Sequence, residues 1–422
     1  MTRRFRLLFG LLAVLPTHAQ DTRRVAEPVM PPSCVALPAR MAGVDEAQPD
    51  TRRIQQALDT CAPGQAVELA AAGSRRAFLS GPLDLRAGVT LRIGAGVTLY
   101  ASRNPRDYDV DPGRCGTVDQ RGRGCRALIN GDHVADAAVM GEGAIDGRGG
   151  SILLSQNVTW WDLAEQARAG GFQNCPRLVV LAYSNNFTLY RITLKNSPNF
   201  HVYYGNGNGF TAWGVVIDTP KTARNTDGID PGASTNVTIT HCFIHAGDDN
   251  VAIKAGGHVS HMTISHNHFY TGHGMSIGSE TFGGAQAIRV TDLSIDGADN
   301  GLRIKSNDTR GGLVRDVVYD DVCIRNTKNP ILMDTHYTAG YSPERGRIPE
   351  FTGIVLRNVR VLDGGKVTLD GYDERHRLGL TFDNVTFDMP GAIRWMTAFA
   401  DVTRTSGSPN SCADKFVPMP NE

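Results

Sequence analysis

Short β-rich runs recur along the chain from about residue 186 onward, and this repeat constrains the fold more than any other feature of the sequence. The runs begin at Asn186, Gly209, Asn236, Met262, Asp292, Asp316, Gly353 and Gly379. Most of the intervals between them are 23–29 residues long, a period typical of proteins built from stacked structural repeats. The chain is therefore expected to form a solenoid.

Each repeat contains only short alternating strands, separated by Gly, Asn and Asp turns. No repeat leaves room for a crossover helix, which excludes a doubly wound sheet and a (β/α) barrel. The pattern predicts an all-β fold, a parallel β-helix. In this fold each coil stacks on the previous one at roughly 4.8 Å, so residues one period apart lie above one another on the same face.

The earlier part of the chain fits the same architecture, although its repeats are less regular. Strands are predicted at residues 67–69, 89–92, 97–100 and 138–140, with a turn at 147–150. Residues 54–61 have the pattern of a short amphipathic helix, which would cover the open N-terminal end of the stack. Residues 160–169 predict a second, inserted helix.

The N-terminus has the three-part layout of a secretory signal peptide. Arg3, Arg4 and Arg6 precede an apolar run from Leu7 to Pro16, and small residues follow at 17–19. A buried strand or a membrane anchor is the alternative, but the apolar run is too short to span a bilayer. We therefore expect a signal peptide at 1–19, a catalytic β-helix domain at 20–400, a tail at 401–422, and a secreted, extracellular protein.

Eight cysteines remain after residue 19, and an even number in an exported chain favours disulfides over metal binding. Cys115 and Cys125 flank a short loop, and Cys34 and Cys61 bracket the predicted first helix, so these two pairs are expected to be bonded. The other four are expected to be free and buried, because two of them lie within strand-like runs; they are Cys175, Cys242, Cys323 and Cys412.

The charges of the chain are balanced, with 43 Lys and Arg residues against 43 Asp and Glu residues. Such a chain has no overall field to attract nucleic acid or an anionic membrane, so neither is an expected partner. Any anionic ligand must instead be bound by cations placed locally.

Four polar motifs interrupt the β pattern at intervals of about one coil: Asn225-Thr226-Asp227, Asp248-Asp249, Gly272-His273-Gly274 and Arg303-Ile304-Lys305. Asp227 and Asp249 are 22 residues apart, and Asp249 and His273 are 24 apart. These intervals match the repeat. The fold itself is therefore expected to place three carboxylates and an imidazole on one face, with Arg303 and Lys305 one coil further along.

This combination of residues suits the hydrolysis of a glycosidic bond. Hydrolysis with inversion needs a protonated carboxylic acid for the leaving oxygen and an ionised carboxylate to activate water. Crowding of like charges raises the pKa of at least one carboxyl, which can keep the acid protonated. Arg303 and Lys305 indicate an acidic sugar, because Arg binds a carboxylate with two hydrogen bonds and Lys acts as a point charge.

Taken singly, each motif also has a structural explanation. Asp227 and Asp230 suit a turn, Asp248 and Asp249 suit a solvated turn or a calcium site, and charged residues at strand positions are usually exposed. Their occurrence in phase with the repeat favours the catalytic interpretation. Lesser candidates are Tyr337, which could stack under a sugar ring, and Lys254, Asn250, Asp334 and Asp373.

The four motifs, in this order, resemble those of the polygalacturonases, family 28 of the glycoside hydrolases. The resemblance extends from about Val25 to Met396 and is closest to the secreted endo-polygalacturonases of bacterial plant pathogens. It implies a right-handed single-stranded parallel β-helix of the pectin-lyase-like type. It also implies an inverting, endo-acting hydrolase of α-1,4 bonds between galacturonic acid units in de-esterified pectin, without a metal or other cofactor, and we expect a monomer.

The resemblance also implies roles for individual residues. Asp248 would be the general acid, Asp227 and Asp249 would hold and deprotonate the water, and His273 would tune the protonation of the acid. Arg303 and Lys305 would bind galacturonate carboxylates beside the scissile bond. Asn225 would shape the site, and Tyr337 would contact the substrate.

Other functions remain open at this point. Within the family, the alternatives are an exo-polygalacturonase and a rhamnogalacturonan or xylogalacturonan hydrolase. A lyase on the same fold would cleave the polymer by β-elimination with bound calcium. A non-catalytic glycan-binding β-helix would have the same acidic residues on one face but would catalyse no reaction.

Overall fold

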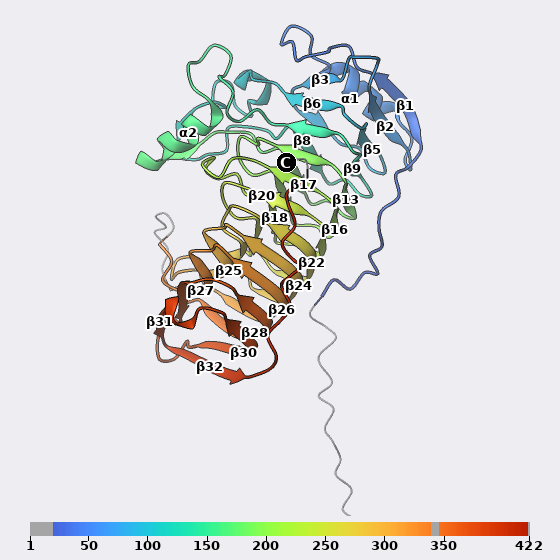
Figure 1. The fold of residues 1–422 in the computed structure, drawn as a ribbon. Helices are drawn as coiled ribbons and strands as arrows, with labels where there is room; N and C mark the ends of the chain where they lie inside the picture. Colours follow the sequence, from blue (N-terminus) through green and yellow to red (C-terminus); the bar gives the residue numbers. More distant parts are fainter. Residues whose placement is uncertain (1–19, 339–345, 421–422) are drawn as a thin grey trace, which may run out of the picture.

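The computed structural model describes residues 20–338 and 346–420, so the signal peptide predicted at 1–19 lies outside the described residues. Nearly all of the regular structure is β-strand, and the strands run parallel in two large sheets of eleven and nineteen strands. A small antiparallel pair, β7 (Val118–Asp119) with β11 (Phe172–Gln173), lies outside them. Figure 1 shows the coils stacked into an elongated molecule, which confirms the parallel β-helix predicted from the repeat.

The eleven-stranded sheet takes one strand from each coil, and neighbours in the sheet follow one another in the chain. Its strands are β4 (Leu83–Asp84), β8 (Ile129–Asp132), β12 (Val179–Ala182), β15 (Val202–Gly205), β18 (Ile229–Gly232), β21 (Val251–Ile253), β23 (Met275–Gly278), β25 (Asn300–Lys305), β27 (Asn329–Asp334), β29 (Gly365–Asp370) and β31 (Ile393–Ala398). This sheet carries or adjoins all the motifs identified from the sequence.

The nineteen-stranded sheet forms the rest of the wall. Its strands are β1 (Ser33–Pro38), β2 (Ala66–Ala70), β3 (Ala77–Ser80), β5 (Thr90–Ile93), β6 (Thr98–Ala101), β9 (Ala138–Met140), β10 (Ala144–Asp146), β13 (Phe187–Tyr190), β14 (Thr193–Lys195), β16 (Asn208–Trp213), β17 (Val216–Asp218), β19 (Thr235–Thr240), β20 (Phe243–His245), β22 (Val259–Phe269), β24 (Ala285–Asp296), β26 (Leu313–Arg325), β28 (Glu350–Val361), β30 (Leu378–Phe387) and β32 (Ala400–Thr405). Earlier coils contribute two short strands, whereas the single strand β22 pairs with both β19 and β20.

The turns within this wall explain why Asn and Asp recur in the repeats. Asn186, Asn236, Asp292 and Asp316 have φ angles of 53°, 56°, 51° and 53°. Among residues other than glycine, Asn and Asp tolerate this left-handed conformation best. The chain can therefore bend at the same point in successive coils without a glycine at each bend.

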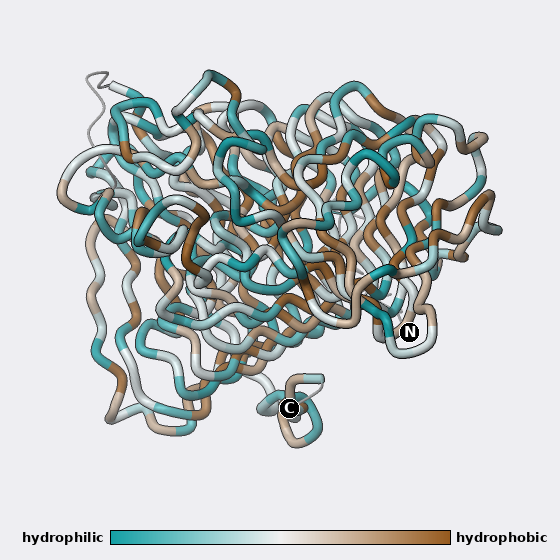
Figure 2. The backbone as a smooth tube through the Cα atoms, turned by 90° about the horizontal axis from the view of Figure 1, so that it is seen from above, coloured by the Kyte–Doolittle hydropathy of each residue, from teal (hydrophilic) through white to brown (hydrophobic). Residues whose placement is uncertain are grey.

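The core is a set of aliphatic ladders inside the coils. Val237, Met262 and Ile288 are fully buried and follow one another in register through β19, β22 and β24. Apolar segments recur in stacked rows when the backbone is viewed along another direction (Figure 2). Each coil buries its apolar side chains only against its neighbours, so stacking supplies the hydrophobic stabilisation that one coil cannot supply alone.

Both predicted helices are present. Helix α1 (Thr51–Thr60) lies near the N-terminal end of the stack, buries Ile54 and Leu58, and contacts β2 and β4 (Figure 1). Helix α2 (Trp160–Gln166) continues into the 3-10 turn η2 (Ala167–Ala169), and Thr159 forms a capping box with Asp162. Within the described residues, neither helix nor any other is long and apolar enough to cross a membrane.

The cysteine predictions are partly correct. Disulfides join Cys34 to Cys61 and Cys115 to Cys125, as predicted, and Cys175 and Cys242 are free and buried. The prediction of free thiols is wrong for the last pair, because Cys323 on β26 is bonded to Cys412. These two lie 89 residues apart in the sequence, so their spacing gave no sign that the C-terminal segment returns to β26.

The C-terminal segment is attached to the outside of the coils. The predicted boundary at residue 400 falls inside β32, which pairs with β30. Beyond β32 the chain turns back along the stack (Figure 1). Besides the disulfide, Lys415 forms ion pairs with Asp292 and Asp321, and Val417 accepts a hydrogen bond from Tyr270. The segment therefore ties several coils together.

We expect removal of the Cys323–Cys412 disulfide by a double Cys→Ala substitution to lower the free energy of unfolding by about 2–4 kcal/mol, because the open chain gains entropy when unfolded. Chemical denaturation of the oxidised proteins would measure the effect. A Cys242→Ala variant, which removes a buried free thiol and no cross-link, is the control. Equal stability of the double variant and the parent would contradict a stabilising role for this cross-link.

Candidate active site

The register of the eleven-stranded sheet aligns three of the motif residues. Ile229 pairs with Val251, and Val251 pairs with Met275. Asp227, Asp249 and His273 each lie two residues before these paired positions. They therefore occupy the same place in three successive coils, in the connections that lead into β18, β21 and β23. The repeat spacing in the sequence becomes side-by-side placement in the structure.

Asp249 is the most heavily bonded of the three carboxylates. Its oxygens accept hydrogen bonds from Ser276 Oγ at 2.6 Å, Lys305 Nζ at 2.8 Å and Arg303 Nη1 at 3.1 Å. Burial by itself would raise the pKa of Asp249, but the charges of Lys305 and Arg303 outweigh it and hold the pKa below the usual value. Asp249 is therefore a fixed, ionised carboxylate.

Asp248 and His273 form a second pair. His273 Nδ1 lies 2.9 Å from Asp248 Oδ1, and Asn225 Nδ2 lies 3.5 Å from the other oxygen. Burial would raise the pKa of Asp248, but the hydrogen bond with His273 lowers it. Burial would lower the pKa of His273, and the same bond and charge raise it. The pair thus favours an imidazolium beside a carboxylate.

Asp227 has the opposite electrostatic character. It lies 3.1 Å from Lys254 Nζ, which also lies 3.7 Å from Asp230, and Asp227 Oδ1 is buried without a hydrogen-bond partner. Burial, opposed by Lys254 and assisted by the charges of Asp248 and Asp249, raises the pKa of Asp227 to about 7. The pKa of Asp230, whose two oxygens accept no hydrogen bond, is raised by burial in the same way.

One expectation about the site needs correction. The argument from crowding held that a protonated carboxyl would be the acid of the site, but the raised pKa values fall on Asp227 and Asp230 and not on Asp248. Desolvation, which the sequence does not show, decides this division. Arg303 and Lys305 are both about 6% exposed and hold Asp249, and their expected role in binding an acidic substrate stays a prediction.

Tyr337 lies over these two cations. Its ring centroid is 5.3 Å from the Arg303 guanidinium carbon and 5.4 Å from Lys305 Nζ. Such contacts stabilise a cation over an aromatic face. Tyr337 therefore belongs to the same cluster as the motif residues, and the contact with substrate that the resemblance implied for it stays a prediction.

Glycines and one asparagine hold the loops close together. A Cβ atom on Gly274 would lie 2.2 Å from the Asn300 and Gly301 carbonyl oxygens, and the φ of Gly274 is 73°. Asn250, a lesser candidate from the sequence, is buried and bonds the carbonyls of Ile244 and Thr271 and the amide of Gly274. Its contacts are those of a residue that joins adjacent coils.

Of the remaining sequence candidates, Lys254 lies within the cluster, near Asp227, Asp230 and Asp249. Asp334 ends β27 and caps the backbone of His336, and burial raises its pKa. Asp373 bonds His376 in a later connection. Ser276 was not identified from the sequence, although its register partner is Arg303, and that alignment was the available signal.

Asp248, Asp249 and His273 offer ligand atoms within 4.8 Å of one another, which raises the possibility of a metal site. The donors do not suit a cation, however. Both oxygens of Asp249 already bind Lys305, Arg303 or Ser276, and these positive charges would repel a metal ion. The set therefore fits a hydrogen-bonded catalytic cluster better than a metal centre.

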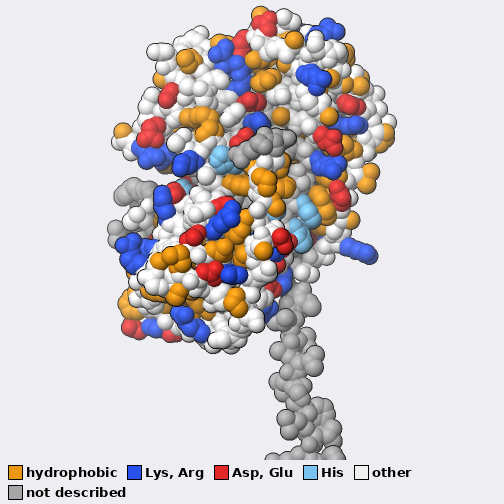
Figure 3. Space-filling view, in the orientation of Figure 1, with side chains coloured by type: hydrophobic (Ala, Val, Ile, Leu, Met, Phe, Trp, Pro, Cys, Tyr) orange, Lys and Arg blue, Asp and Glu red, His pale blue; other side chains and the backbone are white. Residues whose placement is uncertain are grey.

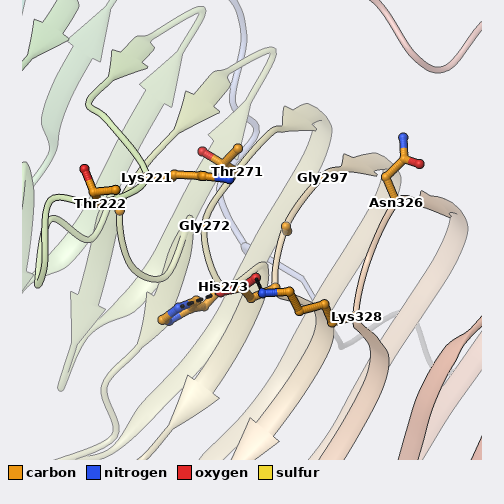
Figure 4. A pocket seen from close by; sticks show the side chains of 11 residues that line it. Lys221, Thr222, Thr271, Gly272, His273, Gly297, Asn326 and Lys328 are labelled. Carbon is orange, nitrogen blue, oxygen red and sulfur yellow. Dashed lines mark ion pairs between the residues drawn. The ribbon is translucent and has the colours of Figure 1, made fainter.

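A pocket of about 250 Å³ opens beside His273. Figure 4 shows side chains of several coils around it, with His273 on its wall. Its lining includes Lys221, Thr222, Thr271, Gly272, Asp299, Asn326 and Lys328. Lys328 is paired with Asp299 at 2.7 Å, and Asp299 lies 3.8 Å from His273 Nε2. The His273 imidazole therefore has a carboxylate near each ring nitrogen, Asp248 at Nδ1 and Asp299 at Nε2.

The model of a protein family described as glycosyl hydrolases family 28 matches residues 61–409. The chain belongs to this family. An endo-polygalacturonase of Pectobacterium carotovorum subsp. carotovorum is 44% identical to this family 28 hydrolase over 90% of this chain and 92% of its own length. A polygalacturonase of Ralstonia nicotianae is 43% identical over 86% of this chain and 80% of its own length.

Solved structures agree with this assignment. The polygalacturonase from Erwinia carotovora ssp. carotovora superposes on this family 28 hydrolase with a TM-score of 0.86 at 42% identity, over 91% of this chain and all of that chain. The endo-xylogalacturonan hydrolase from Aspergillus tubingensis gives a TM-score of 0.67 at 21% identity, which shows the shared fold alone. The resemblance drawn from the four motifs is confirmed.

The ion pair of Asp248 with His273 predicts a pH window of stability. The raised pKa of His273 contributes stability below about pH 6.5 that is lost as the pH rises through its folded value. The lowered pKa of Asp248 contributes stability above about pH 4 that is lost as the pH falls. We expect His273→Gln to destabilise the protein most between these values. Denaturation midpoints would be measured from pH 3 to 9, with a substitution at the exposed His258, His258→Gln, as control. If the pair does not contribute, the difference in midpoint between the parent and His273→Gln will not change with pH.

Proposed function

We propose that this protein is an endo-acting polygalacturonase that hydrolyses α-1,4 bonds between galacturonic acid units, with inversion. The single observation that carries the proposal is that two neighbouring carboxylates of the cluster have different bonding partners. Asp249 is kept ionised by Arg303 and Lys305, whereas Asp248 is bonded to an imidazole. Glycoside hydrolysis needs such unequal partners, one to give a proton and one to activate water.

In this proposal Asp248 is the general acid. Its side chain is 20% exposed, against 3% for Asp227 and 1% for Asp249, so it is the carboxyl best placed to reach a glycosidic oxygen. The Asp248–His273 pair holds the proton in the free protein. A bound polyanion adds negative charge nearby, which raises the pKa of Asp248 and favours transfer of the proton to the carboxyl and then to the leaving oxygen.

Asp227 and Asp249 position and deprotonate the attacking water in this proposal. The bonds to Lys305, Arg303 and Ser276 fix the orientation of Asp249. Asp227, with a pKa raised to about 7, is the stronger base of the two when ionised and accepts the proton of the water. Lys254, between Asp227 and Asp230, supplies the positive charge that allows Asp227 to ionise.

Arg303, Lys305 and Tyr337 form the side of the site that meets the acidic sugar in this proposal. The two cations are compensated by a single carboxylate, Asp249, so positive charge remains for a galacturonate carboxylate. Asn225 contacts Asp248 and receives a hydrogen bond from Gln173, and it positions the acid. The protein is expected to act as an exported monomer on de-esterified pectin.

Digestion of polygalacturonate would test the proposal. Early release of mixed oligomers with a rapid fall in viscosity is the result expected of an endo-acting hydrolase. Release of monomer or dimer alone would indicate exo action. Unsaturated products absorbing in the near ultraviolet would indicate a lyase, and no new reducing ends would contradict the proposed activity. Activity is expected to survive a chelator, because the mechanism uses no metal.

A further inference from the structure

The structure carries another cation in the same column as the catalytic residues. Val179 pairs with Val202, and Val202 pairs with Ile229, which extends the register of the eleven-stranded sheet by two coils toward the N-terminus. Two residues before each paired position, successive coils therefore present Arg177, Phe200, Asp227, Asp249 and His273. Arg177 stands two coils before Asp227.

The guanidinium of Arg177 is held by aromatic rings. Its central carbon lies 4.7 Å from the ring centroid of Phe200 and 4.9 Å from that of Tyr203. The Tyr203 ring is itself packed close to Gly205 and Gly232, where an added Cβ would clash with it or press on it. Arg177 is therefore oriented by a rigid surface, with its planar donor group already in place.

Arg177 has no anionic partner in the part of the chain that the structure describes. By contrast, Arg303 pairs with Asp249, and Arg224 donates a hydrogen bond to the Ala164 carbonyl. None of the side-chain nitrogens of Arg177 is among the buried atoms that lack a partner, so they reach solvent. A guanidinium offers five N–H donors, and here they remain available.

The carboxylates nearest to Arg177 already have another cation as their partner. Lys254 is the cation that lies within 4.0 Å of Asp227, Asp230 and Asp249. Burial lowers the pKa of Arg177, and the charges of Asp230 and Asp227 act in the opposite direction from a longer range. Arg177 is thus close enough for the charges of Asp227 and Asp230 to act on it, but it forms no ion pair with either of them within the described residues.

The spacing along the stack is suited to a chain of acidic sugars. Coils repeat at roughly 4.8 Å, so Arg177 lies about 10 Å before Asp227 along the axis. Arg303 lies two coils after Asp249, beyond the coil of His273. Cations therefore flank the carboxylates on both sides. A galacturonate chain lying along the axis carries a carboxylate on every unit and can meet both.

From these observations we infer that Arg177 is a substrate-binding residue that grips the carboxylate of a galacturonate unit on the N-terminal side of the scissile bond, two coils from Asp227. The aromatic rings of Phe200 and Tyr203 set the plane of the guanidinium, and the carboxylate accepts two parallel N–H bonds. This inference rests on the proposed function and adds to it a specificity-determining residue remote from the reacting bond.

Steady-state kinetics on galacturonate oligomers of increasing length would test this role, with Arg177→Met, Arg177→Lys and the parent protein. We expect Arg177→Met to raise KM about 10- to 100-fold for oligomers long enough to reach the position, because a charge-assisted bidentate contact is lost. The kcat should change little, and the shortest cleaved oligomer should be unaffected. Arg177→Lys should recover only part of the loss, since it keeps the charge without the fork.

Three results separate the possibilities. If the parent protein releases no reducing ends, the proposed function itself fails. If it is active and Arg177→Met has an unchanged KM at every length, the inference about Arg177 is overturned. A loss of kcat that is equal at all lengths would assign Arg177 a merely structural role and would also overturn it. Arg315→Met, at a half-exposed arginine on β26, is the matched control.

A binding measurement covers the case in which Arg177→Met is too unstable for kinetics. Calorimetric titration of Asp248→Asn with a long oligogalacturonate gives the affinity without turnover, and Asp248→Asn with Arg177→Lys gives the effect of the fork alone. We expect the added substitution to weaken binding several-fold and to leave the affinity for the shortest oligomer unchanged. Equal affinity for the long oligomer in both proteins would contradict the inference.

Discussion

Asp248→Asn is expected to lower kcat on polygalacturonate by about 10²- to 10⁴-fold while leaving substrate binding nearly intact. The amide keeps the shape of the side chain but cannot donate the proton that the leaving oxygen needs. Reducing-end assays over time would measure the loss. Thermal unfolding should stay close to that of the parent protein, although the ion pair with His273 is weakened.

The control for this substitution is Asp316→Asn, at a turn on β26 with a φ of 53°, which Asn adopts as readily as Asp. Its side chain is 58% exposed, so no effect on kcat is expected. If Asp248→Asn retained full activity, the general-acid assignment would be wrong. If the Asp316→Asn control and Asp248→Asn both bound the polymer and neither cleaved it, the chain would be a glycan-binding β-helix.

Lys305→Met is expected to have the largest effect on stability, about 3 kcal/mol at neutral pH, and also to abolish most activity. Lys305 and Asp249 are 2.8 Å apart, and both side chains are almost completely buried. Removal of the ammonium leaves a buried carboxylate with Arg303, Ser276 and, at 4.0 Å, Lys254 as its remaining partners. Denaturant unfolding of the parent and the variant would measure the loss.

The sign of the pH dependence follows from Asp249. Its folded pKa lies below the usual value, so it contributes stability above about pH 4 that is lost as the pH falls toward the folded value. In Lys305→Met that pKa rises and the contribution is lost. The difference between the two proteins should therefore be greatest near neutral pH and should shrink in acid, as the pH falls toward the folded pKa of Asp249 in the parent protein.

A double variant, Asp249→Asn with Lys305→Met, tests the cause. It removes both charges of this ion pair but leaves Arg303 buried without its carboxylate partner, so it should recover only part of the stability lost in Lys305→Met. Activity should stay low, since the water-binding carboxylate is gone. A double variant less stable than Lys305→Met would contradict the loss of charge compensation at Asp249 as the cause.

The balanced charge of the chain is visible on its surface. The face drawn in Figure 3 carries acidic and basic side chains interspersed, without a large area of one sign. The cations that we propose for binding an acidic substrate, Arg177, Arg303 and Lys305, lie instead along the eleven-stranded sheet.

Much of the site could be predicted from residue spacing. The intervals of 22 and 24 residues from Asp227 to Asp249 and from Asp249 to His273 are coil lengths. Parallel in-register stacking converts such intervals into proximity, since each coil places equivalent residues above one another. The same register contains Arg177 and Ser276, which the motif search missed because neither belongs to a conspicuous polar cluster in the sequence.

The sequence by itself determined the solenoid, the positions of the helices, the two local disulfides and the motif residues that meet at the site. Each of these follows from local pattern or from the repeat, which act over one coil. Only the tertiary structure decided which carboxyls have raised pKa values, that Arg303 and Lys305 bind Asp249, and that Cys412 returns to Cys323. Burial and contacts between distant segments set these features, and neither is periodic in the chain.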